Sequence, residues 1–467
     1  MEKTILDLFN GLISLKDFST SFISEFVYII GILVGLAIFA LPKRKLNTKK
    51  MSDFWTGFVL VFNSILLMYF YLKDINLFSG FNFTSFSNLF IIDENNTVIK
   101  ILLNTFGIFF LFSTIKITKK FRFRAILLNS ILLVILLLSF LLIQSTNYLI
   151  TYILLALIVF FAYKYASDSR IRKTEVYNPD FILISSCASL LFFLFYISTL
   201  FIKDTLQLNI IQVCASCAVL LKIGIFPMLN YSINIQNKNI PHSILLYCYV
   251  PLIGSIAFWQ IIQNFLINTS IYQITLVCLL SVATYSFALS AFKQRNLIKF
   301  LIQTSYFYIS YAILNFLFFP DSTAGLKLVF LYSFCALGIF SLISIIKINS
   351  KNEQININLI KGLYYKNKLL SYLLALILLI YTSAIPCEIL LFNINVLKNI
   401  YIVDKTGIFL CFGFMVSNML IMLNAFKIIQ SIYSINLLQN LKFKKATILN
   451  YIVALIIIFF LLIAVFL

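Results

Sequence analysis

The sequence predicts an all-α polytopic membrane protein with about fourteen transmembrane helices. Three observations support this fold class. Hydrophobic residues make up 61% of the 467 residues and charged residues only 11%, which is too little polar surface to cover a soluble domain. Apolar segments of about 20 residues, the length that crosses a bilayer, recur along the whole chain. Clusters of Lys and Arg follow odd-numbered segments, as positive-inside topology requires.

The expected helices are the apolar segments themselves, most of them bounded by charged or polar clusters. A helix satisfies every backbone group within one segment, so it is the structure that lipid permits. In chain order the segments cover 22–41, 54–72, 99–118, 125–143, 147–163, 180–201, 208–233, 243–265, 271–292, 297–319, 326–347, 369–396, 407–432 and 448–467.

The loop charges predict the topology. Cations such as Lys43, Arg44 and Lys45 follow the first segment, and similar clusters follow the third, fifth, ninth, eleventh and thirteenth. Even-numbered loops are neutral, mixed or acidic, as with Asp93 and Glu94. Cation-rich loops mark the side of insertion, so both termini are expected on the opposite side. The same distribution accounts for the net charge of +20 without nucleic acid as a partner.

The stretch LLKIGIFPMLN, 220–230, is the main functional candidate. Lys222 follows about fourteen membrane-compatible residues, and a charge at mid-bilayer costs about 2.5 to 3.5 kcal/mol. Pro227 is expected to break the helix, a feature tolerated where a helix lines a cavity or is covered by protein. One interpretation is a lysine in an ion or proton path. The other is a lysine that snorkels from a helix end.

A second proline indicates an internal repeat. The fourth to eighth and the ninth to thirteenth segments form two sets of five, and the fourth member of each contains a proline, Pro227 and Pro386. An odd number of spans would invert one set relative to the other, and paired broken helices indicate a transport site. Coincidence is the alternative. The predicted parts are 1–124, the repeats 125–265 and 271–432, and a final helix within 433–467.

Three ordered stretches resemble the antiporter-like membrane subunits of respiratory complex I, with the subunit 2 type as the best match. They are LLKIGIFPMLNY, AFKQRNLIKFLIQTSYFYISY and LIKGLYYKNKLLSYLLALILLIYTSAIPCEILLF. The resemblance implies two inverted five-helix repeats, a broken helix in each, and a role in coupling quinone reduction to proton movement.

The proton-path residues that the resemblance implies are mostly replaced. The lysine of the first broken helix is present as Lys222. The expected glutamate falls near Tyr152, a second lysine at Leu252, a histidine at Tyr308 and a third lysine at Ile394, with Lys398 one turn further. These departures put independent pumping by this chain in doubt.

Four other residues are candidates, each with a simpler interpretation. Glu388, two residues after Pro386, could serve as a protonatable site or pair with Lys398 or a neighbouring subunit. Glu25 is expected near the outer interface. Lys299 matches a basic residue of the family but is also explained by anchoring at the membrane surface. His242, the only histidine, could handle protons or simply be solvated.

The expected role is therefore that of a membrane-arm subunit of NADH:ubiquinone oxidoreductase in the mitochondrial inner membrane, with both termini in the intermembrane space. No cofactor, metal-ligand cluster or direct NADH or quinone site is expected, and the partners are other membrane-arm subunits and lipids. The alternatives are a free-standing cation/proton antiporter, a subunit 4-like chain, and a scaffolding subunit with a decayed proton path.

Overall fold

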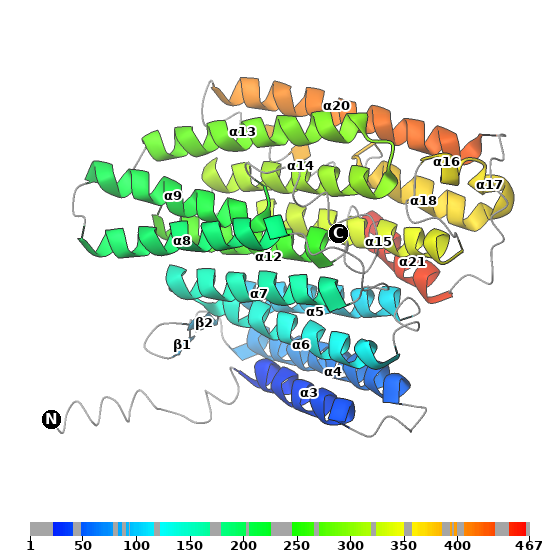
Figure 1. The fold of residues 1–467 in the computed structure, drawn as a ribbon, viewed down its shortest axis with the longest axis horizontal. Coiled ribbons are helices and arrows are strands. Elements are labelled where there is room, and N and C mark those ends of the chain that lie inside the picture. Colours follow the sequence, from blue (N-terminus) through cyan, green and yellow to red (C-terminus); the bar gives the residue numbers. More distant parts are fainter. Residues whose placement is uncertain are drawn as a thin grey trace. The chain divides into compact units, whose positions relative to one another are not determined.

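The computed structural model is almost entirely helical (Figure 1). The structure describes residues 22–40, 48–77, 83–85, 90–92, 94–115, 122–168, 179–201, 205–225, 245–265, 270–318, 324–349, 357–384, 393–394, 397–398, 406–434 and 448–463.

The chain divides into two compact units. Unit 1 comprises Met1–Leu111 with Thr118–Ser169, and unit 2 comprises Phe112–Ile117 with Arg170–Leu467. The division falls after the fifth long helix, inside the predicted first repeat. The predicted repeat boundaries therefore differ from the compact units and remain a prediction.

Unit 1 is built from five long helices and a small hairpin. Helix α3 packs on α4 and α6, and α6 packs on α7. The hairpin pairs its strands in antiparallel fashion, with Thr84 opposite Ile91, and it is an addition to the predicted all-α fold. The elements are α3 (Ile23–Ala40), α4 (Thr48–Leu77), β1 (Phe83–Ser85), β2 (Phe90–Ile92), α5 (Glu94–Thr114), α6 (Arg122–Gln144) and α7 (Tyr148–Asp168).

Two helices, α14 and α15, lie at the centre of unit 2. Of the residues in their apolar segments, 94% and 100% are buried. Helix α13 packs on α14 and α20, while α15 contacts α18 and α21. The elements are α8 (Pro179–Phe201), α9 (Thr205–Ile223), the π-helical turn η3 (Leu245–Tyr249), α12 (Val250–Phe265), α13 (Ser270–Lys293), α14 (Leu297–Phe318), α15 (Ala324–Asn349), α16 (Ile357–Ile360), α17 (Leu363–Lys366), α18 (Lys368–Tyr381), α20 (Thr406–Tyr433) and α21 (Ile448–Ile463).

Asparagine side chains start three of these helices. The Oδ1 atoms of Asn147, Asn296 and Asn367 accept backbone N–H groups in the first turns of α7, α14 and α18, at 2.9, 3.0 and 3.1 Å. The first N–H groups of a helix have no partner within it, and Asn is among the best residues at this position. The polar residues that the sequence places between apolar segments therefore define helix starts.

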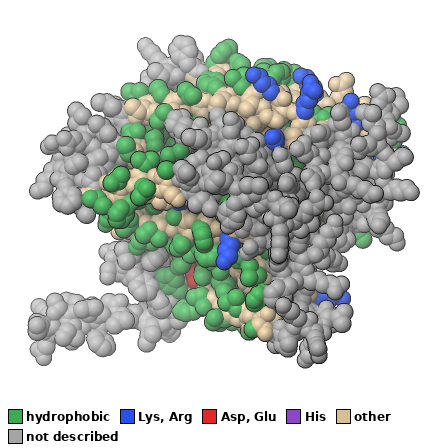
Figure 2. Space-filling model, in the orientation of Figure 1, with side chains coloured by type: hydrophobic (Ala, Val, Ile, Leu, Met, Phe, Trp, Pro, Cys, Tyr) green, Lys and Arg blue, Asp and Glu red, His purple; other side chains and the backbone are tan. Residues whose placement is uncertain are grey.

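Large apolar side chains cover much of the described surface (Figure 2). Phe54 and Ile65 on α4 are 75% and 63% exposed, and Phe412 and Met419 on α20 are 69% and 67% exposed. Apolar surface on this scale is typical of contact with lipid. Among the described residues, nine helices are long and apolar enough to cross a membrane. The predicted helical membrane fold is confirmed at this level, while the count of fourteen spans and their inverted repeat remain predictions.

Candidate functional site

Helix α9 ends directly after Lys222. Gly224 has φ 89°, and its N–H donates to the carbonyl of Leu221 at 3.1 Å, while the N–H of Ile225 donates to the carbonyl of Leu220 at 3.0 Å. This pair of bonds is a Schellman motif, which ends a helix on a left-handed residue that is usually glycine. The helix therefore ends at Ile223, four residues before Pro227, which lies outside the described residues. Gly224, rather than the proline, supplies the observed end.

The Lys222 side chain lies inside unit 2 and is only 5% exposed. Its Nζ atom donates to the carbonyl oxygen of Ser185 at 3.0 Å and to the Oγ atom of Ser189 at 2.6 Å, both on α8. The Ser189 hydroxyl donates in turn to the Ser185 carbonyl at 2.9 Å. The ammonium also lies in the last turn of α9, where a positive charge offsets the negative end of the helix dipole. The Lys222 ammonium is therefore enclosed and hydrogen-bonded, unlike a lysine head group that reaches bulk solvent.

Helix α12 packs tightly against the end of α9. A Cβ atom on Gly254 would lie 2.3 Å from Cγ1 of Ile223, so the glycine is required for this close approach. The π-helical turn η3 precedes α12, next to Pro251, which lacks the N–H for a regular helical bond. Leu252, where the resemblance implies a lysine, is fully buried. The sequence therefore puts an apolar side chain in this part of the site.

Helix α18 ends in the same way as α9. Ser383 has φ 57°, its N–H donates to the carbonyl of Ile380 at 3.0 Å, and the N–H of Ala384 donates to the carbonyl of Leu379 at 2.9 Å. The left-handed residue again precedes a proline by three positions, although Pro386 lies outside the described residues. Helices α9 and α18 therefore both end in a Schellman motif, and in each the left-handed residue lies three positions before a proline.

Tyr381 stands in α18 where Lys222 stands in α9, two residues before the left-handed residue. Its hydroxyl donates to the carbonyl of Leu301 at 3.1 Å and lies 2.7 Å from Oγ of Ser305, one turn further along α14. Lys222 contacts a carbonyl and the serine one turn further along α8 in the same pattern. The end of α18 therefore has a neutral hydroxyl at the position of the ammonium at the end of α9.

Three tyrosines form a buried cluster around this point. Tyr308 stacks on Tyr332 with ring centroids 3.7 Å apart, and each meets Tyr381 edge to face at 5.8 Å. The Tyr308 hydroxyl donates to Oδ1 of Asn418 on α20 at 2.8 Å. Tyr308, a predicted candidate, therefore lies at the centre of unit 2 and is fully buried.

The left-handed residue of α18 joins this cluster. Nδ2 of Asn393 donates to the hydroxyl oxygens of Tyr332 at 2.7 Å and Ser383 at 2.8 Å. The two hydroxyls lie 3.2 Å from each other. Polar groups at the second helix end therefore bond one another through neutral side chains.

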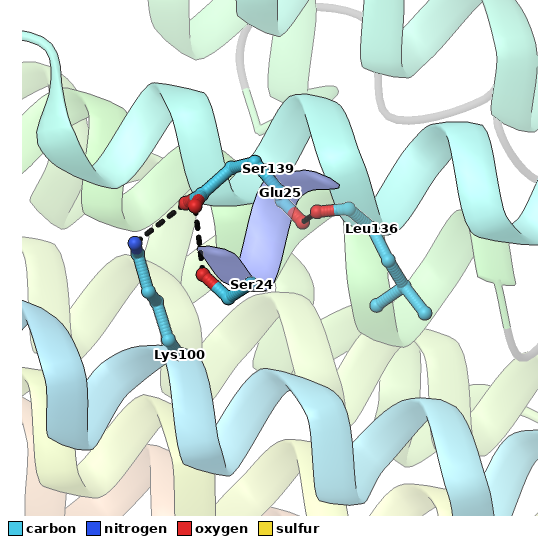
Figure 3. Close-up of polar contacts among 5 residues, drawn as sticks. All are labelled: Ser24, Glu25, Lys100, Leu136 and Ser139. Carbon is cyan, nitrogen blue, oxygen red and sulfur yellow. Dashed lines mark hydrogen bonds and ion pairs between the residues drawn. The ribbon is translucent and has the colours of Figure 1, made fainter. Parts of the chain in front are cut away.

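Glu25 forms a buried ion pair in unit 1 (Figure 3). Its Oε1 atom accepts from Nζ of Lys100 on α5 at 2.6 Å, and its Oε2 atom accepts from Oγ of Ser24 at 2.7 Å. Glu25 is 3% exposed and Lys100 2% exposed. Sequence reasoning missed Lys100, although a cation near the start of the third apolar segment, opposite in sign to a carboxylate near the start of the first, was a usable signal.

The other predicted residues lie apart from these contacts or outside the described residues. Lys299 is half-buried in the first turn of α14, and its backbone N–H donates to Asn296. Lys398 and Ile394 are exposed. The remaining candidates lie outside the described residues: Glu388, His242, Pro227 and Pro386. Within the described ranges no three metal-ligating side chains come together.

Comparison with known proteins identifies the fold. The chain is similar to a chain of respiratory complex I from Thermus thermophilus, a structure solved with bound aureothin. The TM-score is 0.75 at 13% sequence identity, and the match covers 95% of this chain and 96% of that one. No family model matches the sequence, and no curated protein matches it. The likeness therefore establishes the fold over nearly the whole chain.

Proposed function

We propose that this chain is a membrane-arm subunit of a mitochondrial NADH:ubiquinone oxidoreductase, of the subunit 2 type, and contributes to proton translocation coupled to quinone reduction. The observation that carries the proposal is the fold, which matches a complex I chain over 95% of this chain. A shared fold can host different functions, so the site must support the assignment independently.

The site supports the proposal through Lys222. An ionisable residue within an apolar segment is by default a functional candidate, because the cost of its burial must be balanced by a role. Lys222 lies in the last turn of α9, at the negative end of the helix dipole, and its ammonium donates to a carbonyl and a hydroxyl of α8. The geometry suits a cation that changes its protonation or its partners during turnover.

The experiment is purification from mitochondrial membranes followed by the variant Lys222→Met. The chain should copurify with NADH:quinone reductase activity in a large complex. Lys222→Met should leave the complex assembled and lower the number of protons moved per electron. The matched control is Lys164→Met, which removes an exposed lysine from α7. Isolation of the chain as a monomer with transport activity of its own would instead identify a free-standing cation/proton antiporter.

A specific observation favours one second candidate, a scaffolding subunit whose proton path has decayed. Tyr381 stands at the end of α18 where Lys222 stands at the end of α9, and Leu252 and Tyr152 stand where the resemblance implies ionisable residues. In that case Lys222→Met would leave the proton-to-electron ratio unchanged in an intact complex. The same measurement therefore separates the two candidates.

A further inference from the structure

We propose that Glu25 and Lys100 form a proton-exchanging site inside unit 1, separate from Lys222. The proposal deepens the proposed function and rests on it for the source of the energy that drives the exchange. The geometric evidence is a carboxylate and an ammonium that lie 2.6 Å apart. Helices α3, α5 and α6 enclose both groups almost completely (Figure 3).

The ion pair is not needed to fix how α3 and α5 pack. One turn along both helices, the Tyr28 hydroxyl donates to Oδ1 of Asn104, a neutral bond that already sets the register. Asn104 also donates to the carbonyl of Leu60 at 2.9 Å and to Oγ of Ser64 at 2.6 Å, which links α4. A buried ion pair is often no more stabilising than apolar side chains of similar volume. A second connection made of two charges therefore calls for a role other than packing.

The surroundings favour proton exchange between the two groups. Each carboxylate oxygen of Glu25 has one donor, Lys100 on Oε1 and Ser24 on Oε2. The Lys100 ammonium also lies 5.5 Å from the centre of the Phe140 ring. Bonds between charged groups at such short distances are strong, and 2.6 Å is within the reach of direct proton transfer. The pair therefore has a donor, an acceptor and a hydroxyl within direct contact.

Most of the other titratable side chains described on the neighbouring helices are tyrosines. Trp55 donates to the carbonyl of Gly31 at 3.1 Å, so the start of α4 lies beside the middle of α3 rather than beside Glu25. Lys50 and Asp53 belong to that start, and Asp53 accepts from Asn129 at 2.8 Å. The other titratable side chains described on α3, α4 and α7 are those of Tyr28, Tyr69, Tyr71, Tyr148, Tyr152, Tyr163, Lys164 and Tyr165.

The exchange balances in three steps. A proton from water binds the Glu25 carboxylate, so the pair becomes a neutral acid beside the Lys100 ammonium. The ammonium then releases a proton to a second water molecule, which would enter during turnover, and becomes a neutral amine. Finally the carboxylic proton moves across the 2.6 Å contact to the amine and restores the ion pair. One proton is taken up and one is delivered in each cycle.

The test is infrared difference spectroscopy on the chain purified with its partners, after a change of pH and during NADH oxidation. We expect a carboxyl band that disappears in Glu25→Gln and in the double variant Glu25→Gln/Lys100→Met, and shifts in Glu25→Asp. The double variant should also lower the number of protons moved per electron. Asp53→Asn, which removes a carboxylate of the same unit, should leave the band in place.

A spectrum in which the double variant matches the unaltered protein would overturn the proposal and assign the pair to structure. If the double variant does not assemble, Glu25→Asp keeps both charges and decides the question through the presence or absence of the shift. If the chain copurifies with no NADH:quinone reductase, the proposed function fails, while the pH-induced spectrum still reports on Glu25.

Discussion

Tyr381 and Lys222 occupy equivalent positions at two similar helix ends. Each lies two residues before a left-handed residue, Ser383 or Gly224, that closes a Schellman motif. Each contacts a backbone carbonyl and a serine hydroxyl one turn further along a neighbouring helix. The ends of α9 and α18 therefore share a backbone motif but differ in charge.

The glycine that ends α9 should be required for stability. Gly224→Ala places a side chain at φ 89°, which costs about 1 to 2 kcal/mol. Thermal unfolding in detergent should show the loss. Gly57→Ala is the matched control, because its added Cβ would meet Leu111 at an ordinary 3.7 Å. Equal stability of the two variants would contradict the assigned helix end.

The close contact between α9 and α12 should not tolerate an added methyl group. Gly254→Ala brings a Cβ to 2.3 Å from Ile223, and overpacking of this kind costs about 1 to 3 kcal/mol. The double variant Gly254→Ala/Ile223→Ala should recover part of the loss, because the clashing atoms are removed. Unfolding midpoints of the single and double variants measure this. No recovery would mean that the two helices do not meet at this point.

The hydroxyl of Tyr381 should matter less than the ammonium of Lys222. Tyr381→Phe removes a bond to the carbonyl of Leu301, at a cost of about 1 kcal/mol. Thr304 and Ser305 keep their own bonds to α14 carbonyls. We expect assembly and an unchanged proton-to-electron ratio, in contrast to Lys222→Met. A ratio that falls equally in both variants would show that the neutral half also carries protons.

The Glu25–Lys100 pair should show strong coupling in a double-mutant cycle. Glu25→Gln or Lys100→Met alone leaves one buried charge without its partner, which costs about 3 to 5 kcal/mol. The double variant should lose less than either single change, because no lone charge remains. Denaturation of all four proteins in detergent measures the coupling. Additive losses would contradict a direct interaction between the two buried charges.

Much of the fold was predictable from the sequence, because apolar segments bounded by charge are a strong signal. The helices over 23–40 and 297–318, for example, nearly coincide with the predicted segments 22–41 and 297–319. The hairpin of β1 and β2 was missed because it lies in a short polar and aromatic loop without a clear alternating pattern.

The site was predictable only in part. Lys222 was identified because a charge in an apolar segment is visible in the sequence. Its partners were not, because Ser185 and Ser189 come from another helix and serines are common in such segments. The helix end was assigned to Pro227, although the left-handed residue Gly224 makes the observed end. Ser383 was harder still, because a serine rarely adopts positive φ.

The shared helix ends also imply an electrostatic asymmetry. A helix terminus carries roughly half a negative elementary charge on its last carbonyl groups. The ammonium of Lys222 compensates that potential at α9, whereas Tyr381 leaves it in place at α18. A cation would thus meet a compensated terminus at α9 and a negative one at α18, so two helix ends with the same backbone motif differ in electrostatic potential.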